Sequence, residues 1–192
     1  NMFKNCKLLK NISFISKSSV ILENQSFSEC NQLKKVIIFG DRILLGEKCF
    51  YKSFNEAFQN MVHIESNTLV EIEKQCFKES FIKTIDVKSN EVHIKKESFS
   101  NSMQLLSFTV FDSMEVFIDD FSFKDCSNQT SISLDEIGYI KICSSAFYGC
   151  EKIQNINLNF TKPFSSLKYY KSKCVLKRHA KYKIHLNKKK DL

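Results

Sequence analysis

The 192-residue chain has no tryptophan, one proline and four glycines. No segment rich in proline, glycine or serine interrupts residues 15–158, so we expect no domain boundary there. No apolar run approaches the ~18 residues that a transmembrane helix needs. The length suits one globular domain or one array of repeats.

Short catalytic and metal-binding motifs are also missing. The sequence contains no C-x-x-C, H-E-x-x-H, G-x-G-x-x-G, P-loop or G-x-S-x-G pattern. None of the histidines has the spacing of a ligand pair; they are His63, His93, His179 and His185. We therefore predict that the protein is not an enzyme and holds no metal and no cofactor.

Phenylalanine, in contrast, is abundant, with 18 copies. Seven of them recur at intervals of 22 to 27 residues: Phe3, Phe27, Phe50, Phe77, Phe99, Phe123 and Phe147. A fixed period of about 20–50 residues is typical of stacked-repeat proteins, in which each unit buries its apolar side chains only against its neighbours. We predict that these rings stack as the spine of a solenoid.

The residues around each phenylalanine repeat as well. Counted from the phenylalanine, aliphatic residues stand at −7 and −5 (Val20 and Leu22), and Cys or Ser stands at +3. Further apolar residues follow at about +6, +9 and +11, as in Leu33, Val36 and Ile38. Alternation with a period of two predicts short strands, whereas the 3–4 spacing between them predicts a short helical turn. The expected fold is an α/β repeat solenoid of about seven coils with parallel strands.

The pattern resembles a known family. Leu33-x-x-Val36-x-Ile38 has the L-x-x-L-x-L form of leucine-rich repeats. The run from Ala146 through Phe147 and Cys150 to Leu158 resembles the signature of BspA-like leucine-rich repeats. The resemblance covers about residues 1–160. It implies a surface antigen that acts in cell adhesion or host–cell contact, located at the cell surface or secreted.

Two repeats depart from the common register. After Phe50 the chain carries a three-residue excess, so the register of residues 50–65 is open and we place its strand at Val62 and Ile64. After Phe77 the pattern fits only with one residue deleted, which places Ile82 and its two partners in the core.

We divide the chain into a leucine-rich repeat array (1–159), a C-terminal cap (160–176) and a basic tail (177–192). The cap would cover the last coil with four apolar side chains: Phe164, Leu167, Tyr169 and Leu176. The N-terminus starts on Asn1 and has no signal-peptide core, so we expect a fragment or a processed product.

The positive charge is concentrated at the C-terminus. Residues 1–160 carry 18 Lys and Arg against 20 Asp and Glu, whereas residues 161–192 carry 11 against one. This segment is either a solvated tail or a contact for an anionic membrane, a glycan or nucleic acid. Specific recognition of nucleic acid is not expected, because no aromatic platform or zinc finger accompanies the lysines.

The eight cysteines follow the repeat. Cys6, Cys30, Cys126 and Cys150 occupy the +3 position, where other repeats carry Ser. A small buried residue suffices there, so we predict reduced structural thiols. Neighbours such as Cys6 and Cys30 would nonetheless be one coil apart, which is compatible with a disulfide.

Function would reside on the outward residues of the +9/+11 strand, at +8, +10 and +12 on the concave face. The candidate ligand-binding residues are Thr84, Asp86, Ser107, Thr109, Ser131, Ser133, Asn155 and Asn157. Their hydroxyl and amide groups can donate and accept hydrogen bonds. These groups could also merely solvate the sheet or bond to one another. Exposed Ile37 and Phe39 add apolar contacts.

Glycosylation sequons occur at Asn11, Asn24, Asn128 and Asn159 and are weak evidence for secretion. We predict a protein- or glycan-binding repeat protein. The alternatives are an intracellular interaction scaffold in the cytoplasm and a polyanion- or membrane-binding protein that uses residues 168–190.

Overall fold

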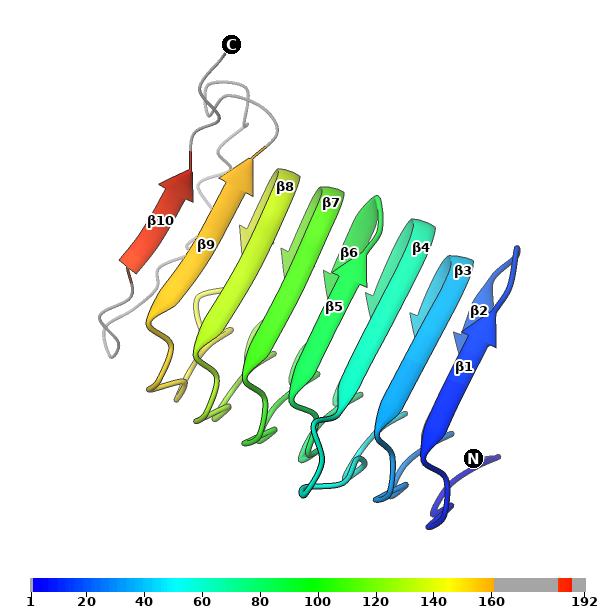
Figure 1. The fold of residues 1–192 in the computed structure, drawn as a ribbon. Coiled ribbons are helices and arrows are strands. Elements are labelled where there is room, and N and C mark those ends of the chain that lie inside the picture. The colour runs from blue at the N-terminus through cyan, green and yellow to red at the C-terminus, as the bar shows by residue number, and fades with distance from the viewer. Residues whose placement is uncertain (1, 161–182, 188–192) are drawn as a thin grey trace.

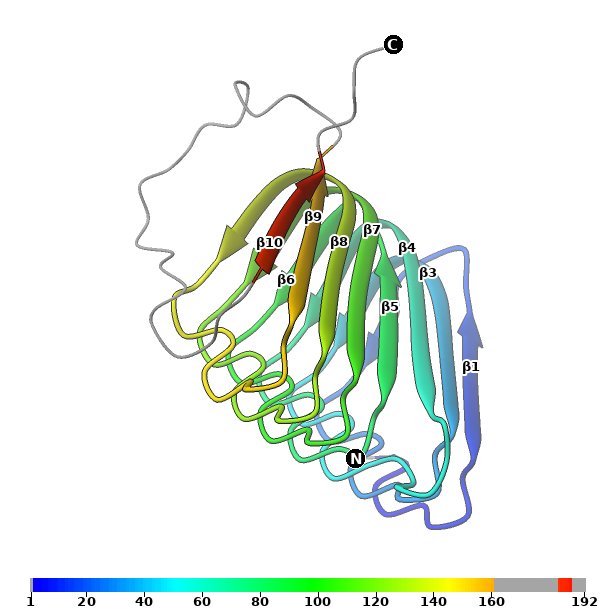
Figure 2. The ribbon, with the colours of Figure 1, turned by 60° about the vertical axis from the view of Figure 1, so that its left-hand side comes forward.

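A computed structural model of the chain describes residues 2–160 and 183–187. These residues form one ten-stranded parallel sheet wound into a solenoid (Figure 1, Figure 2). The strands are β1 (Asn11–Ile15), β2 (Val20–Leu22), β3 (Lys35–Leu45), β4 (Met61–Ile72), β5 (Thr84–Lys88), β6 (Glu91–Ile94), β7 (Ser107–Ile118), β8 (Ser131–Ile142), β9 (Asn155–Phe160) and β10 (Lys183–Asn187). The predicted repeat solenoid is therefore confirmed.

Each coil contributes two strand segments. In β3, β4, β7 and β8 a bend joins the two segments, whereas the first and fourth coils carry them as separate strands, β1/β2 and β5/β6. Figure 2 shows that in each coil the chain bends over one edge of the solenoid and returns on the other side. Equivalent residues pair in parallel, so that Val36 lies between Ile12 and Val62.

The alternation of the sequence decides which side chains enter the core. In β3 the inward residues Val36, Ile38, Ile43 and Leu45 are fully buried, and the residues that alternate with them, such as Ile37 and Leu44, are more exposed. The inward pairs of the other coils line up with these residues through the parallel register. Because no coil can bury its apolar side chains alone, the core is a continuous column between the two strand layers.

A ladder of phenylalanine rings runs through this core. Phe3, Phe27, Phe50, Phe77, Phe99, Phe123 and Phe147 stack with centroid distances of 4.9 to 5.5 Å and interplanar angles of 2° to 21°. Seven rings separated by one coil each mark six full turns. The expected number of about seven coils is therefore corrected to about six turns.

The short helical turns expected around each phenylalanine are not present. The described residues contain no helix; the chain makes tight turns with positive φ at positions −2 and +2, as at Gln25 (58°) and Glu29 (62°). Positive φ interrupts a right-handed helix after every few residues. The N–H of Phe27 donates to Cys49 O of the next coil at 2.9 Å, and the N–H groups of Gln25 and Glu29 donate in the same direction. The spacing of three to four residues between the phenylalanine and the next inward residues thus reflects tight turns, which are held by hydrogen bonds to the turns of the next coil.

The Cys or Ser at +3 has a bonding role. Ser53 Oγ donates to Phe27 O of the preceding coil at 2.6 Å, and Cys126 Sγ donates to Phe99 O at 3.1 Å. A hydroxyl and a thiol can both make this contact, which explains why the repeats interchange them. The described cysteines are free thiols, and Cys174 lies outside the described residues. Burial raises the pKa of the Cys126 thiol well above its usual value.

The irregular third coil keeps its strand in register. Val62 and Ile64 are fully buried and pair with Val36 and Ile38, as expected. Phe54, with a φ of 74°, is fully buried beside the spine, 5.9 Å from the ring of Phe50. It supplies the apolar volume that the +6 residue supplies in other coils.

The predicted cap (160–176) and tail (177–192) lie mostly outside the described residues. Within them the structure describes Phe160 and β10, which pairs in parallel with β9. Among the described residues, no helix is long and apolar enough to cross a membrane.

Candidate binding face

The outward side chains of the first strand segments form one surface, which we call the first-strand face. It comprises β1, β5, residues 155–159 of β9, and residues 35–39, 61–65, 107–111 and 131–135 of β3, β4, β7 and β8. These segments lie toward the viewer in Figure 1. All of these segments except β1, which among the described strands of this face pairs only with β3, are paired on both sides, so their backbones are fixed and the side chains stand in straight columns.

The eight predicted ligand-binding residues lie together in two of these columns. The register aligns Thr84, Ser107, Ser131 and Asn155 in one column. It aligns Asp86, Thr109, Ser133 and Asn157 in the other. All eight are half-buried or exposed. Parallel strands lie about 4.8 Å apart, so each side chain is adjacent to its equivalents in the neighbouring coils.

Most of these polar groups bond to no part of the described protein. The side chains of Ser107, Thr109, Ser131, Asn155 and Asn157 have no hydrogen-bond partner among the described residues. Of the eight, Ser133 Oγ donates to Asp135 Oδ2 at 2.8 Å and Thr84 Oγ1 donates to Asn60 O at 3.4 Å.

The buried hydroxyls at the turns behave differently. Ser53, Ser102 and Ser122 each donate to a backbone carbonyl oxygen within 2.6 Å. These turn hydroxyls are therefore used by the fold, whereas, within the described part of the chain, the hydroxyls and amides of Ser107, Thr109 and Asn157 on the first-strand face are not.

The third coil adds residues that the sequence analysis left out of the columns. Met61, His63 and Glu65 complete the three columns between β3 and β5. The ring of His63 meets that of Phe39 edge-on at 5.6 Å. The outward position of Met61, His63 and Glu65 could have been predicted from the sequence, because a strand that turns Val62 and Ile64 inward must turn the residues beside them outward.

Charges border the polar columns near the centre of the face. Lys88 Nζ lies 3.6 Å from Glu65 Oε1 and 3.5 Å from Asp112 Oδ2, so one cation links two acids from the coils on either side of its own. Asp86 makes no ion pair within the described part of the chain.

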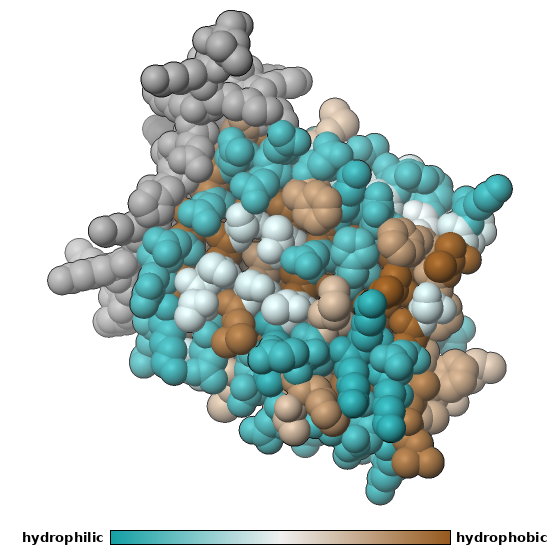
Figure 3. All heavy atoms as spheres, viewed as in Figure 1, coloured by the Kyte–Doolittle hydropathy of each residue, from teal (hydrophilic) through white to brown (hydrophobic). Residues whose placement is uncertain are grey.

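The N-terminal part of the face is more apolar. Ile15 is 78% exposed, and Ile37 and Phe39 are half-buried. Hydrophobic groups gather over β1 and β3 at the right of Figure 3, whereas paler hydroxyl-bearing residues occupy the centre. The two parts of the face therefore suit different contacts: apolar groups near β1 and hydrogen bonds near β7 and β8.

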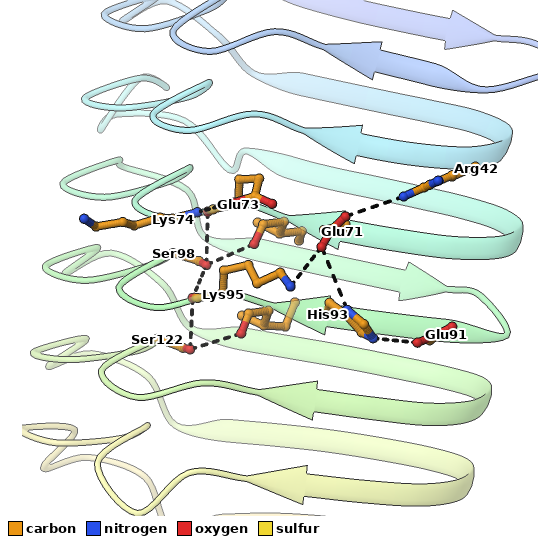
Figure 4. Close-up of polar contacts among 11 residues, drawn as sticks. Arg42, Glu71, Glu73, Lys74, Glu91, His93, Lys95, Ser98 and Ser122 are labelled. Carbon is orange, nitrogen blue, oxygen red and sulfur yellow. Dashed lines mark hydrogen bonds and ion pairs between the residues drawn. The ribbon is translucent and has the colours of Figure 1, made fainter.

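The second strand segments carry a network of ion pairs in which the charged side chains pair with one another. Glu71, 17% exposed, lies 2.9 Å from Lys95 Nζ, 3.8 Å from Arg42 and 3.9 Å from His93 Nδ1 (Figure 4). The hydrogen bond to Glu71 raises the pKa of Lys95 above its usual value. His93 also contacts Glu91 at 2.6 Å. Glu71 already has Lys95 and Arg42 as cationic partners, and Glu91 is hydrogen-bonded to His93, so we assign the network to stability.

A groove of about 320 Å³ crosses the turns near Lys4, Tyr51 and Lys78. Its charges are likewise paired: Lys4 lies 3.7 Å from Glu29, and Lys78 lies 3.3 Å from Glu97. The hydrogen bond from Gln75, together with Lys78, lowers the pKa of the Glu97 carboxyl. Among Lys4, Glu29, Lys78 and Glu97, no charge is left unpaired, so these residues do not indicate a ligand in the groove.

The described residues contain no group of three His, Cys, Asp or Glu side chains that could hold a metal ion. His63 and His93 lie on different strand segments, and His179 lies outside the described residues.

Comparison with known protein families identifies the repeat. A family model described as the BspA type leucine rich repeat region matches residues 1–119 and 116–174, with six copies along the chain. No curated protein and no solved structure matches the chain.

Proposed function

The chain belongs to the family of BspA-type leucine-rich repeat proteins, and we propose that it is a non-enzymatic binding protein that holds its partner on the first-strand face. Repeat proteins of this kind present an extended surface for interaction with other proteins. The finer proposal is adhesion: the partner is a protein or glycan on the surface of another cell.

One observation carries this proposal. The side chains of Ser107, Thr109, Ser131, Asn155 and Asn157 lie in adjacent columns with no intramolecular hydrogen bond among the described residues. Each hydroxyl and amide can both donate and accept. A partner that meets these columns can form several hydrogen bonds at once, without breaking bonds that stabilise the fold.

The backbone makes the surface suitable for recognition. β7 pairs with β5 and β8 along its first segment, and β8 pairs with β7 and β9. The columns are therefore held in place before the partner arrives, which limits the loss of conformational entropy on binding.

A triple variant with Thr109→Lys, Ser133→Lys and Asn157→Lys tests the proposal. Three bulky charges in one column should reduce binding to intact cell surfaces at least tenfold. The melting temperature should change little, because Thr109 and Asn157 make no contact that the fold needs. Binding is measured by flow cytometry with labelled protein, and stability by circular dichroism.

A control variant adds the same charge elsewhere: Asn90→Lys, Met114→Lys and Ser144→Lys, all at exposed positions off the face. It should bind as the unmodified protein does. Equal binding by both triple variants would show that the first-strand face is the wrong surface. A face-dependent partner found only in cytosolic extract would support the intracellular scaffold instead.

A further inference from the structure

The C-terminal half of the first-strand face carries a patch without charge. Ser107, Thr109, Ser131, Asn155 and Asn157 form what we call the hydroxyl–amide patch, which spans β7, β8 and β9. Two carboxylates border it: Asp135, which accepts a hydrogen bond from Ser133, and Asp86, which lies in register with Thr109. The patch itself holds no cation, so an anionic ligand would find no opposite charge there, and its hydroxyls and amides favour a neutral partner.

The backbone under the patch is closed to strand addition. β7 and β8 pair with a neighbour on each side, and β9 lies between β8 and β10. A peptide that binds by extending a sheet needs an unpaired edge. The ligand must therefore be recognised through side chains, and it must bring many hydrogen-bonding groups of its own to match the hydroxyls and amides.

The patch repeats at regular intervals in two directions. Neighbouring columns of one strand stand about 6.6 Å apart, and neighbouring strands about 4.8 Å apart. A ligand that is itself a polymer of identical units can thus make similar contacts at each successive coil.

An aromatic ring borders the patch. Phe111 of β7 is half-buried and lies in register between Lys88 and Asp135. Its ring stacks on no other ring among the described residues. An apolar ring face beside a set of hydroxyls matches a sugar, which has C–H groups on one face and hydroxyls around its rim.

From these features we propose that the hydroxyl–amide patch binds a neutral polysaccharide, with its chain lying across β7, β8 and β9. The inference rests on the proposed function and names the ligand class for this part of the face. The hydroxyls of the sugar bond to Thr109, Ser131 and Asn157, and one sugar ring packs against Phe111.

The test uses the full chain in native gels that contain soluble polysaccharides. The neutral probes are a β-glucan, a mannan and a xylan, and the anionic probe is polygalacturonate. We expect at least one neutral probe to retard the protein. A variant with Thr109→Val, Ser131→Ala and Asn157→Ala should weaken that retardation at least tenfold, and Phe111→Ala should weaken it severalfold.

A control variant with Ile37→Ser and Phe39→Ser changes the apolar part of the same face and should keep the polysaccharide affinity. Folding of every variant is checked by circular dichroism. No retardation by any neutral probe, retardation by polygalacturonate alone, or retardation that the triple variant leaves unchanged would each overturn the inference. If the lysine variant loses cell binding while no neutral polysaccharide binds, the face holds a protein and only the polysaccharide inference falls.

Discussion

At the scale of single residues, the core of the solenoid holds an amide side chain at a position that is aliphatic in several other coils. Gln129 stands at +6, where other coils carry Leu33, Leu105 or Ile153. Its side chain is fully buried, and its Nε2 atom has no hydrogen-bond partner among the residues that the structure describes. A buried donor that loses its water and gains no acceptor destabilises the folded state.

Gln129→Leu should therefore raise the free energy of unfolding, by about 1–3 kcal/mol. Chemical denaturation followed by circular dichroism measures the change. The matched control is Leu105→Gln, one coil away, which places the same amide in a fully buried apolar site and should destabilise the fold. A Gln129→Leu variant that unfolds more easily than the unmodified protein would contradict the argument.

At the scale of structural elements, the phenylalanine ladder joins the coils. An inner ring such as Phe99 stacks on Phe77 and Phe123 and is fully buried. Phe3, at the N-terminal end, stacks on one ring and is 40% exposed. The energetic contribution of a ring should thus depend on its place in the ladder.

Phe99→Ala should lower the free energy of unfolding by about 3–5 kcal/mol, since the cavity in the middle of a packed column cannot collapse. Phe3→Ala should cost much less, because solvent already reaches that ring. Urea denaturation of both variants provides the comparison. Equal losses would mean that the rings contribute independently of their neighbours.

The strands and the spine could be predicted because they leave a periodic signal. The aliphatic pairs, such as Val92 and Ile94, alternate with outward residues, and parallel stacking then fixes the columns of the face. The turns could not be predicted, because residues such as Gln25 and Glu97 adopt positive φ although they are not glycines. Hydrogen bonds between coils impose the positive φ, and the local sequence has no preference that would predict it.

At the scale of the whole molecule, charge separates the array from its C-terminal segment. Residues 161–192 hold 11 basic residues and one acid, whereas the array is close to neutral. Many acids of the described array pair with a cation, as Glu71 and Glu97 do. A polyanion would therefore be drawn to the C-terminal segment, and the attraction should weaken as salt screens it.

Lys188→Gln, Lys189→Gln and Lys190→Gln should lower the salt concentration that elutes the protein from a heparin column. The control removes three charges from exposed positions of the array: Lys7→Gln, Lys17→Gln and Lys74→Gln. It should elute close to the unmodified protein. Retention that does not respond to salt, or that falls equally in both variants, would show that the C-terminal segment is not the contact for polyanions.

The hydrogen bonds between the turns run in both directions along the stack. The N–H of Phe27 donates to Cys49 O of the next coil, whereas the N–H groups of Gly46 and Glu73 donate to the preceding coil. An inner coil is therefore tied to both of its neighbours, and the opposed bond dipoles offset one another instead of adding up as they do in an α-helix.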